Sequence, residues 1–497
     1  MNESVLIKHI VLVGQHLPLM MSAAILSSQL ADQPVRISAV EIKGESTSQI
    51  ESSGSEFMSL CDILKLPFKT VMQQCQGTFS LGQHYIYNQR DWFVPYGHFG
   101  IQPSNNEFIQ GLLRLAHHDP SLKLESACIA AQAARLGKFA IPPTNRPDLH
   151  QALAFAVNLN ADAYAQQLKQ FALGHNVTFM PAINIEVTRS ENQHIEAINL
   201  DGQQNITADF WIDCSGCLAR LTAQDDVITT QSPSLYWNRQ AQCMVDDEAS
   251  FNQPYTRLHT SPWGWLKVIP LAGRVCIQLE YASQQVSEAE INQWLCDYWS
   301  LSATQATGII HRQNQLTMRE KAWQGNCLTV GDGAVNMSKL FFSELYFIQA
   351  ALVQFLDSYP SLTNQKVSAD WFNRQWQQFI EEANDYVQCH YGLIDQVNNT
   401  NTSLLSAALQ QRLDMFERLG RLPPSNTDAV SDNAWYGLLA GCKTATSKQL
   451  TSLYLSNLSD EQLHDSLNKI KLSIDKLVAV MPRYRDFYQQ FNRSQGY

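Results

Sequence analysis

Residues 331–352 contain the groups whose type and spacing have the clearest chemical meaning in this sequence. An apolar segment, residues 326–330, leads into Gly331-Asp332, and after a short loop an apolar helix is predicted to start at about Leu345. Flavoproteins use this order of strand, Gly-Asp, loop and helix to bring backbone amides and one carboxylate to the ribityl and phosphate part of FAD. Gly331 and Asp332 are therefore predicted to be cofactor-binding residues.

A βαβ unit near the N-terminus is the element expected to hold the other end of such a cofactor. The pattern predicts a strand at His9–Val13, a helix at Leu17–Leu30 and a second strand at Val35–Glu41. Gly14 follows the first strand, where a tight turn is needed. Glu41 ends the second strand, where the acceptor for a ribose 2′-hydroxyl belongs. Both residues join the cofactor-binding candidates.

The turn after the first strand departs from the G-x-G-x-x-G fingerprint, whose glycines admit a pyrophosphate and let helix and strand pack closely. Here it runs Gly14-Gln15-His16-Leu17-Pro18-Leu19, so only the first glycine is present. Pro18 also removes one amide donor from the start of the helix. Either a protonated His16 contacts phosphate directly, or its imidazole fills the space that the pyrophosphate would occupy. The second interpretation, a blocked cofactor site, is the simpler one.

Composition narrows the class of protein. Lys and Arg number 35 against 46 Asp and Glu, and the net charge of −11 argues against binding to nucleic acid or to an anionic membrane. The 11 cysteines have no repeated spacing, and the one C-x-x-C, at Cys214 and Cys217, lacks a second pair, so no metal site is expected. Free thiols favour the cytoplasm. The N-terminal apolar segment is interrupted at residues 14–16, which predicts neither a signal peptide nor a transmembrane span.

The remaining pattern divides the chain into two regions. We expect a mixed α/β region over residues 1–345, a Rossmann-like FAD-binding box with an inserted β-sheet at about 50–110 and 230–320. Residues 84–100 are rich in aromatic side chains and look like strands lining a site for a small aromatic ligand, although packing of a sheet explains them equally well. Residues 346–497 are expected to be mainly helical, with a break at 437–441.

Five segments, in order along nearly the whole chain, resemble the flavin-dependent tryptophan halogenases. They are ADFWIDCSGCLARL at 208–221, whose Gly216 ends a buried strand and is a further cofactor-binding candidate, GWLKVIP at 264–270, the helix at 372–391, Trp435 to Gly441, and the 331–352 loop. The resemblance implies an FAD-dependent monooxygenase-like box with a helical C-terminal pyramid. It also implies FADH2 from a separate flavin reductase, oxygen, and tryptophan or another electron-rich arene as substrate.

The residues that carry halogenation in this family are replaced in this sequence. Thr78-Phe79-Ser80-Leu81-Gly82 resembles the family's T-F-K-x-G, which puts Ser80 at the position of the catalytic Lys. Phe341 falls on the catalytic Glu, and residues 342–344 fall on the halide-binding Ser-Thr-Gly. No catalytic residue is therefore predicted, although Lys267 and Glu344 are candidate stand-ins.

Three hypotheses remain open. The first is a divergent, non-catalytic member of the family, a pseudoenzyme whose pocket serves as a ligand-binding or regulatory module. The second is an FAD-dependent monooxygenase that uses the flavin hydroperoxide directly on an aromatic substrate and needs no lysine. The third is a halogenase that uses displaced residues. The first is preferred, because the changes fall at several separate steps of one mechanism.

Overall fold

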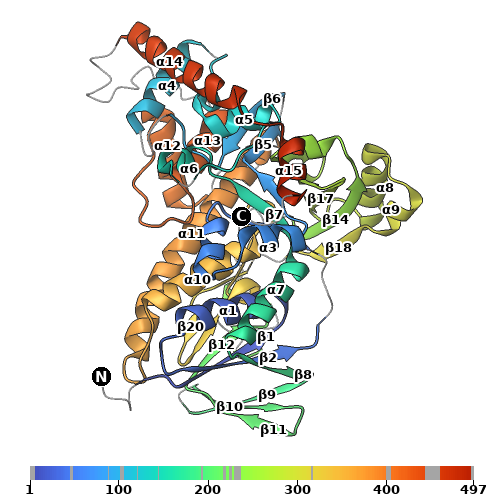
Figure 1. Cartoon of the computed structure of the whole chain (residues 1–497), viewed down its shortest axis with the longest axis vertical. Helices are drawn as coiled ribbons and strands as arrows, with labels where there is room; N and C mark the ends of the chain where they lie inside the picture. The colour runs from blue at the N-terminus through green and yellow to red at the C-terminus, as the bar shows by residue number, and fades with distance from the viewer. Residues whose placement is uncertain are drawn as a thin grey trace.

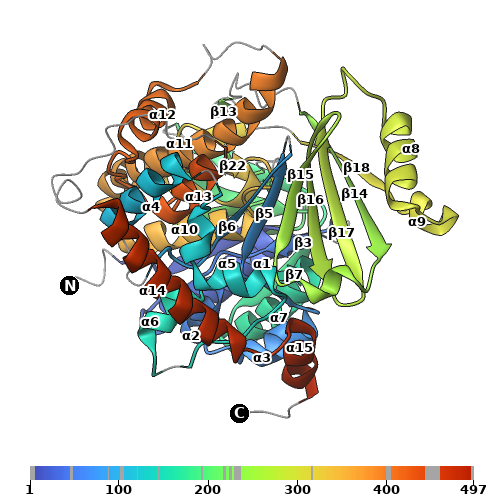
Figure 2. The ribbon, with the colours of Figure 1, turned by 90° about the horizontal axis from the view of Figure 1, so that it is seen from above.

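The computed structural model describes most of the chain, and Figures 1 and 2 show its architecture. The described residues are 6–44, 49–87, 89–100, 106–119, 121–143, 145–191, 194–216, 220–222, 227–228, 237–314, 317–398, 405–442 and 459–493.

A six-stranded sheet forms the nucleotide-binding type of core expected at the N-terminus. Its strand order is β20-β21-β12-β1-β2-β8, and every neighbouring pair is parallel except β20 and β21. The strands are β1 (His9–Gly14), β2 (Arg36–Ile42), β8 (Thr178–Ala182), β12 (Phe210–Cys214), β20 (Trp323–Gln324) and β21 (Cys327–Thr329). This sheet and the helices around it confirm the predicted mixed α/β class and its Rossmann-like core.

The predicted βαβ unit is present because its apolar segments are buried on both sides. The run Val11–Val13 in β1 is fully buried, as expected of a central parallel strand. Helix α1 (His16–Gln29) buries every residue from Leu17 to Ser27, because the parallel sheet, α7 (Ala161–Gly174) and α10 (Glu344–Asp357) surround it. The carboxyl ends of β1, β2, β12 and β21 consequently meet at one edge of the sheet.

A seven-stranded sheet stands beside this core, and in Figure 2 its strands fan out across the right half of the molecule. Its order is β18-β14-β17-β16-β15-β5-β6. The strands are β5 (Gly82–Tyr87), β6 (Arg90–Pro95), β14 (Arg239–Asp246), β15 (Thr256–Ser261), β16 (Gly264–Leu271), β17 (Arg274–Tyr281) and β18 (Ile310–Gln313). Alternation along β16 sends Leu266 and Val268 toward α8 (Glu288–Trp299), whereas Trp265 enters the main core.

Three small sheets complete the strand content. They are β3-β7-β4, with β3 (Ile50–Ser52), β7 (Ala156–Asn160) and β4 (Thr78–Ser80); β11-β10-β9, with β9 (Ile185–Arg189), β10 (Ile195–Leu200) and β11 (Gln204–Ile206); and β13-β19-β22, with β13 (Val227–Ile228), β19 (Thr317–Arg319) and β22 (Val335–Asn336). The first of these lies against the seven-stranded sheet, because Thr78 Oγ1 on β4 donates to the carbonyl oxygen of Pro270 on β16 at 2.8 Å.

Helices dominate the chain after residue 343, as predicted, and several shorter helices precede them. The later ones, beyond α10, are α11 (Gln365–Asn398), α12 (Ala407–Leu419), α13 (Asp432–Cys442), α14 (Asp460–Ala479) and α15 (Tyr484–Arg493). The earlier ones, beyond α1, α7 and α8, are α2 (Phe57–Ile63), α3 (Phe68–Gln74), α4 (Asn106–His118), α5 (Ile129–Arg135), α6 (Pro147–Ala152) and α9 (Ala303–Thr307). Within the described residues, no helix is long and apolar enough to cross a membrane.

The predicted break at 437–441 is wrong, because α13 runs through it. A Cβ atom added at Gly437 would lie 3.2 Å from the side chain of Val94. One added at Gly441 would lie 2.1 Å from the ring of Trp92. The two glycines therefore let the helix pack closely on β6, at the cost of some helix propensity.

Candidate functional site

Two pockets lie along the edge where the parallel strands end, and they contain three of the cofactor-binding candidates. The first, about 540 Å³, is lined by Glu41 and Gly44 at the end of β2. The second, about 280 Å³, is lined by Gly216 after β12 and by Asp332 after β21. These three candidates therefore lie at one edge of the sheet, although its strands come from segments about 300 residues apart. Their role in binding a cofactor stays a prediction.

The side chains of Gln15 and His16 lie between these two pockets and line both. Both also approach the chain after β2: a Cβ atom built on Gly44 would lie 1.9 Å from Gln15 Oε1 and 3.1 Å from His16 Nε2. His16 has a φ of 50°, in the left-handed region that a glycine adopts at lower cost. Its Nε2 is buried and has no hydrogen-bond partner among the described residues.

Gly14 and Gly331 are required by packing at this edge. A Cβ atom at Gly14 would lie 2.2 Å from the carbonyl oxygen of Cys214 on the neighbouring strand. Gly331 has a φ of 64°, and a Cβ there would lie 3.2 Å from the ring of Pro18 and 2.9 Å from Oε1 of Glu344. Neither glycine lines the two pockets.

The polar groups of Asp332, in the loop after β21, are engaged by Lys339 of the same loop and by Glu344 at the start of α10. Lys339 forms a short ion pair with the Asp332 carboxylate. The Asp332 backbone N–H donates to Glu344 Oε1 at 3.3 Å. Burial raises the pKa of Glu344 to about 8, and the charge of Asp332 acts in the same direction. Glu51 on β3 lines the same pocket, and burial raises its pKa as well.

Glu41, the predicted ribose acceptor, is also paired. Its Oε2 accepts from Lys169 Nζ on α7 at 2.6 Å, and both side chains are partly exposed. The carboxylate still borders the first pocket, so the pair could open for a ligand at modest cost, because half-exposed ion pairs contribute little to stability.

A third pocket of about 250 Å³ lies between β5, β6 and β16 of the seven-stranded sheet, the segment that follows β3, and the helical region. Aromatic residues form much of its lining: Tyr96, Phe341, Phe342, Tyr346 and Tyr386. Lys267 on β16 is its one basic lining residue within the described part of the chain. Lys267 is 4% exposed, and burial lowers the pKa of its ammonium group to about 8. Asp332 and Glu344 line the second pocket, whereas Phe341 and Phe342 line the third.

Ser80 and Phe341, at the expected catalytic positions, take part in ordinary packing. Ser80 is 1% exposed and its hydroxyl donates to the carbonyl of Gly82 at 3.0 Å. The ring of Phe341 stacks on His390 with 3.9 Å between centroids. Burial lowers the pKa of His390 to about 3, so the imidazole is neutral at physiological pH.

The aromatic segment at 84–100 packs the core more than it faces a ligand. Tyr85 and Trp92 stack on each other at 5.1 Å, and Phe93 and Phe99 are buried in the same cluster. Of the aromatic residues in this segment, Tyr96 lines the third pocket. Core packing, one of the two interpretations left open, therefore accounts for most of them.

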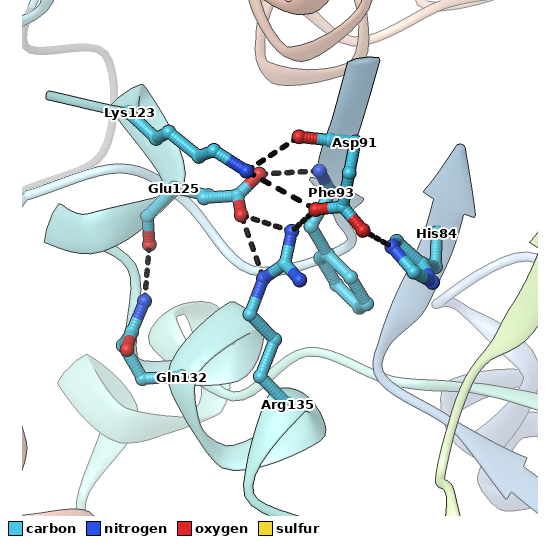
Figure 3. A network of polar contacts seen from close by, with 7 residues as sticks. All are labelled: His84, Asp91, Phe93, Lys123, Glu125, Gln132 and Arg135. Carbon is cyan, nitrogen blue, oxygen red and sulfur yellow. Dashed lines mark hydrogen bonds and ion pairs between the residues drawn. The ribbon is translucent and has the colours of Figure 1, made fainter. Parts of the chain in front are cut away.

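A polar network holds the β5–β6 hairpin, which carries part of the third pocket, against α5 (Figure 3). Arg135 donates to Glu125 at 2.6 Å and to Asp91 at 2.6 Å. His84 on β5 makes a short contact with the Asp91 carboxylate, and Lys123 donates to the same residue. The arginine compensates the buried Glu125 carboxylate, which also accepts the Phe93 backbone N–H.

Comparisons with known proteins identify the fold and the family. A model of the family described as tryptophan halogenase matches residues 9–454. The chain belongs to this family. Its relatives include tryptophan 6-halogenase ThaL of Streptomyces albogriseolus, 24% identical over 412 residues, which cover 76% of this chain and 75% of that protein. The match to tryptophan 7-halogenase KtzQ of Kutzneria, 29% identical over 245 residues, spans less than half of each chain, 48% and 46%.

Solved structures with the same fold include two flavin-dependent halogenases. Xcc4156 from Xanthomonas campestris has a TM-score of 0.87 at 22% identity and covers 99% of this chain and 100% of its own. BrvH from Brevundimonas sp. BAL3 has a TM-score of 0.86 at 20% identity and covers 98% and 99%. The resemblance to tryptophan halogenases predicted from five sequence segments is confirmed.

Several groups of this halogenase-family site were not predicted from the sequence. The pairs Lys339–Asp332 and Lys169–Glu41 and the buried position of Glu51 depend on the folded chain. The described residues contain no cluster of His, Cys, Asp and Glu able to hold a metal ion. Of the C-x-x-C pair, Cys214 is a buried thiol beside Ser22, and Cys217 lies outside the described residues.

Proposed function

We propose that this protein is a ligand-binding member of the tryptophan halogenase family that does not halogenate through the family's lysine and glutamate. The observation that carries the proposal is the pair of side chains at those positions. Ser80 has no amine to hold or react with hypohalous acid, and its hydroxyl is already engaged. Phe341 has no carboxyl group, and its ring is stacked on His390.

The first and second pockets together form a cofactor groove at the carboxyl ends of the parallel strands. This groove supports the same proposal, because its residues do not fit the pyrophosphate of FAD. A dianion needs free donors and positive charge. The second pocket instead contains carboxyl groups of Glu51, Asp332 and Glu344 and no lysine or arginine among its described lining residues. Lys339 is paired with Asp332, and Lys43 lines the first pocket only. The side chains of Gln15 and His16 also cross the groove. FAD is the cofactor that the family implies, and we infer that this chain binds it weakly.

The third pocket is the place where a small aromatic ligand fits best. Five aromatic side chains line it, and polar groups of residues 52–56 also line it. No nucleic-acid or membrane partner is part of the proposal.

A flavin-reductase-coupled assay with bromide and tryptophan tests the proposal. We expect no brominated product from the wild-type chain under conditions in which an active family member gives product. The double variant Ser80→Lys/Phe341→Glu should also be inactive, because it leaves the groove unchanged. A variant carrying His16→Gly and Glu344→Gly should bind FAD more tightly than the wild type, since both changes clear the groove. Bromination by the wild type would refute the proposal.

A second candidate function is an FAD-dependent halogenase or monooxygenase acting on tryptophan, indole or another electron-rich aromatic compound. Two observations favour it: Lys267 lines the pocket that Phe341 also lines, and Glu344, with a pKa of about 8, can hold a proton at neutral pH. A flavin reductase would then supply FADH2, and the cofactor would bring oxygen chemistry. Mass spectrometry of the same assay separates the cases, because halogenation and hydroxylation add different masses.

A further inference from the structure

Lys267 is a buried cation without a counterion. Its side chain projects from β16 into the third pocket and is 4% exposed, and it forms no hydrogen bond or ion pair with any described residue. An ammonium group removed from water without a partner is costly, so a buried lysine of this kind ordinarily pairs with an acceptor or coordinates a ligand.

The carboxyl groups around Lys267 do not provide that acceptor. Glu280 on β17 is fully buried and accepts from Ser338, Asn314 and Tyr391, which use its oxygens. Burial raises the pKa of Glu280 to about 7, so this group is only partly ionised at neutral pH. Burial raises the pKa of Glu51 as well, and neither carboxyl group forms an ion pair with Lys267. An anion on a ligand would complete the site.

The two ends of the third pocket differ in charge and in exposure to water. Glu56 and Asp428, its acidic lining residues, are exposed and therefore hydrated and screened. Lys267 is buried, and Tyr386 near it is buried too. An entering ligand would consequently place an anionic group at the inner end and keep neutral atoms near the mouth.

The walls and the size define the rest of the ligand. Phe341, Phe342, Tyr346 and Tyr386 come from the 331–352 loop, α10 and α11 and offer aromatic surfaces. A cavity of about 150 Å³ accommodates benzene, so the 250 Å³ here can hold one ring with a short polar group. Serines 52, 53 and 55 and Gln83 supply neutral hydrogen-bonding groups.

We propose that this pocket binds a single-ring aromatic carboxylate, with the ring between the aromatic side chains and the carboxylate on the ammonium group of Lys267. This inference rests on the proposed ligand-binding function and names the class of ligand. It does not require flavin, so it can fail or hold independently of the halogenation assay.

Because Lys267 is an ionisable group, the affinity of this site for a carboxylate should depend on pH. The ionisable groups facing the pocket or Lys267 from the neighbouring elements are Glu51, Glu56, Tyr96, Cys276, Glu280, Tyr346, Tyr386 and Asp428. Carboxylate binding needs the protonated amine, whose pKa is about 8, so affinity should fall about tenfold between pH 7 and pH 9. A neutral ligand of the same shape should show no such fall.

The test is calorimetric or fluorescence titration of the full chain with benzoate and with benzamide, which differ in charge and hardly in shape. In the variant Lys267→Met we expect the Kd for benzoate to rise by at least about tenfold and that for benzamide to stay within about twofold. Lys476→Met, which removes an exposed lysine on α14, should change neither. Thermal unfolding checks that each variant is folded.

Three results would overturn the inference: no binding of benzoate by the wild type, equal binding of benzoate and benzamide, or benzoate binding that Lys267→Met leaves unchanged. If the Lys267→Met variant does not fold, the inference is decided by comparing how the affinities of the wild type for benzoate and for benzamide change with pH. Flavin binding together with a Lys267-dependent benzoate site would overturn the proposed function and leave this inference standing.

Discussion

Replacing Glu280 by glutamine should change how the stability of the protein depends on pH. Glu280 is fully buried on β17, where Ser338 Oγ donates to it at 2.8 Å and Asn314 Nδ2 at 2.9 Å. Burial outweighs these hydrogen bonds and raises the pKa of the carboxyl group to about 7, against an ordinary value of 4.5. The folded protein therefore binds the proton more tightly than the unfolded chain.

The sign and size of the effect follow from this difference. A carboxyl group whose pKa is raised on folding contributes its full stability below pH 4.5 and loses it as the pH rises through about 7. At about 1.4 kcal/mol per pKa unit, the complete loss is about 3 kcal/mol. Between pH 5 and pH 8 the wild type should lose about 2 to 3 kcal/mol of its free energy of unfolding through this group. A glutamine amide at this position does not titrate, so the variant lacks this loss.

Urea unfolding of the wild type and of Glu280→Gln at pH 5, 6, 7 and 8, followed by tryptophan fluorescence, measures the difference between the two proteins. Ionisable groups that are present in both proteins contribute equally to both free energies of unfolding and cancel in this difference. We expect this difference in unfolding free energy to change by about 2 to 3 kcal/mol in favour of the variant as the pH rises from 5 to 8. Glu186→Gln, at an exposed position on β9, is the matched control and should show no trend. If the difference in unfolding free energy between Glu280→Gln and the wild type stays constant from pH 5 to pH 8, the raised pKa of Glu280 is refuted.

Two further substitutions test the packing and charge arguments. Gly14→Ala should lower the free energy of unfolding by about 1 to 3 kcal/mol in chemical denaturation, because the added methyl group would lie 2.2 Å from a carbonyl oxygen of β12. Gly174→Ala, where no atom lies within 4 Å, should be neutral or slightly stabilising. Arg135→Met should cost about 3 to 5 kcal/mol in the same measurement, because it leaves the buried Glu125 carboxylate without its cation. Arg146→Met breaks a fully exposed pair and should cost far less than Arg135→Met. Equal effects within either pair of variants would contradict the burial argument.

The elements of the nucleotide-binding core could be predicted because their signals are local. The strand and helix predicted at 9–13 and 17–30 are β1 and α1 to within two residues. The strand at 326–330 and the helix from about Leu345 correspond to β21 and α10. Apolar runs, turn residues and family segments each report on a few neighbouring positions, and here they agreed.

Contacts between distant segments could not be predicted in this way. Lys169 and Glu41 are 128 residues apart in sequence, and nothing in either segment indicates the other. Lys267 was recognised as a candidate stand-in, but the absence of a partner among the described residues and the aromatic wall opposite it require the structure. The glycines of α13 misled the prediction, because a glycine that admits a neighbouring side chain looks the same in sequence as one that ends a helix.

Titration of the purified wild-type chain with FAD, and with FADH2 under anaerobic conditions, tests the central claim most directly. The claim is that the edge of the parallel sheet has the backbone fold of the family, but that side chains of this chain fill the space and engage the polar groups that FAD would need. We predict no saturable binding of either form at concentrations up to about 100 µM, and tighter binding after His16→Gly with Glu344→Gly. Stoichiometric flavin in the purified protein, or a Kd below about 10 µM for either form, would contradict it.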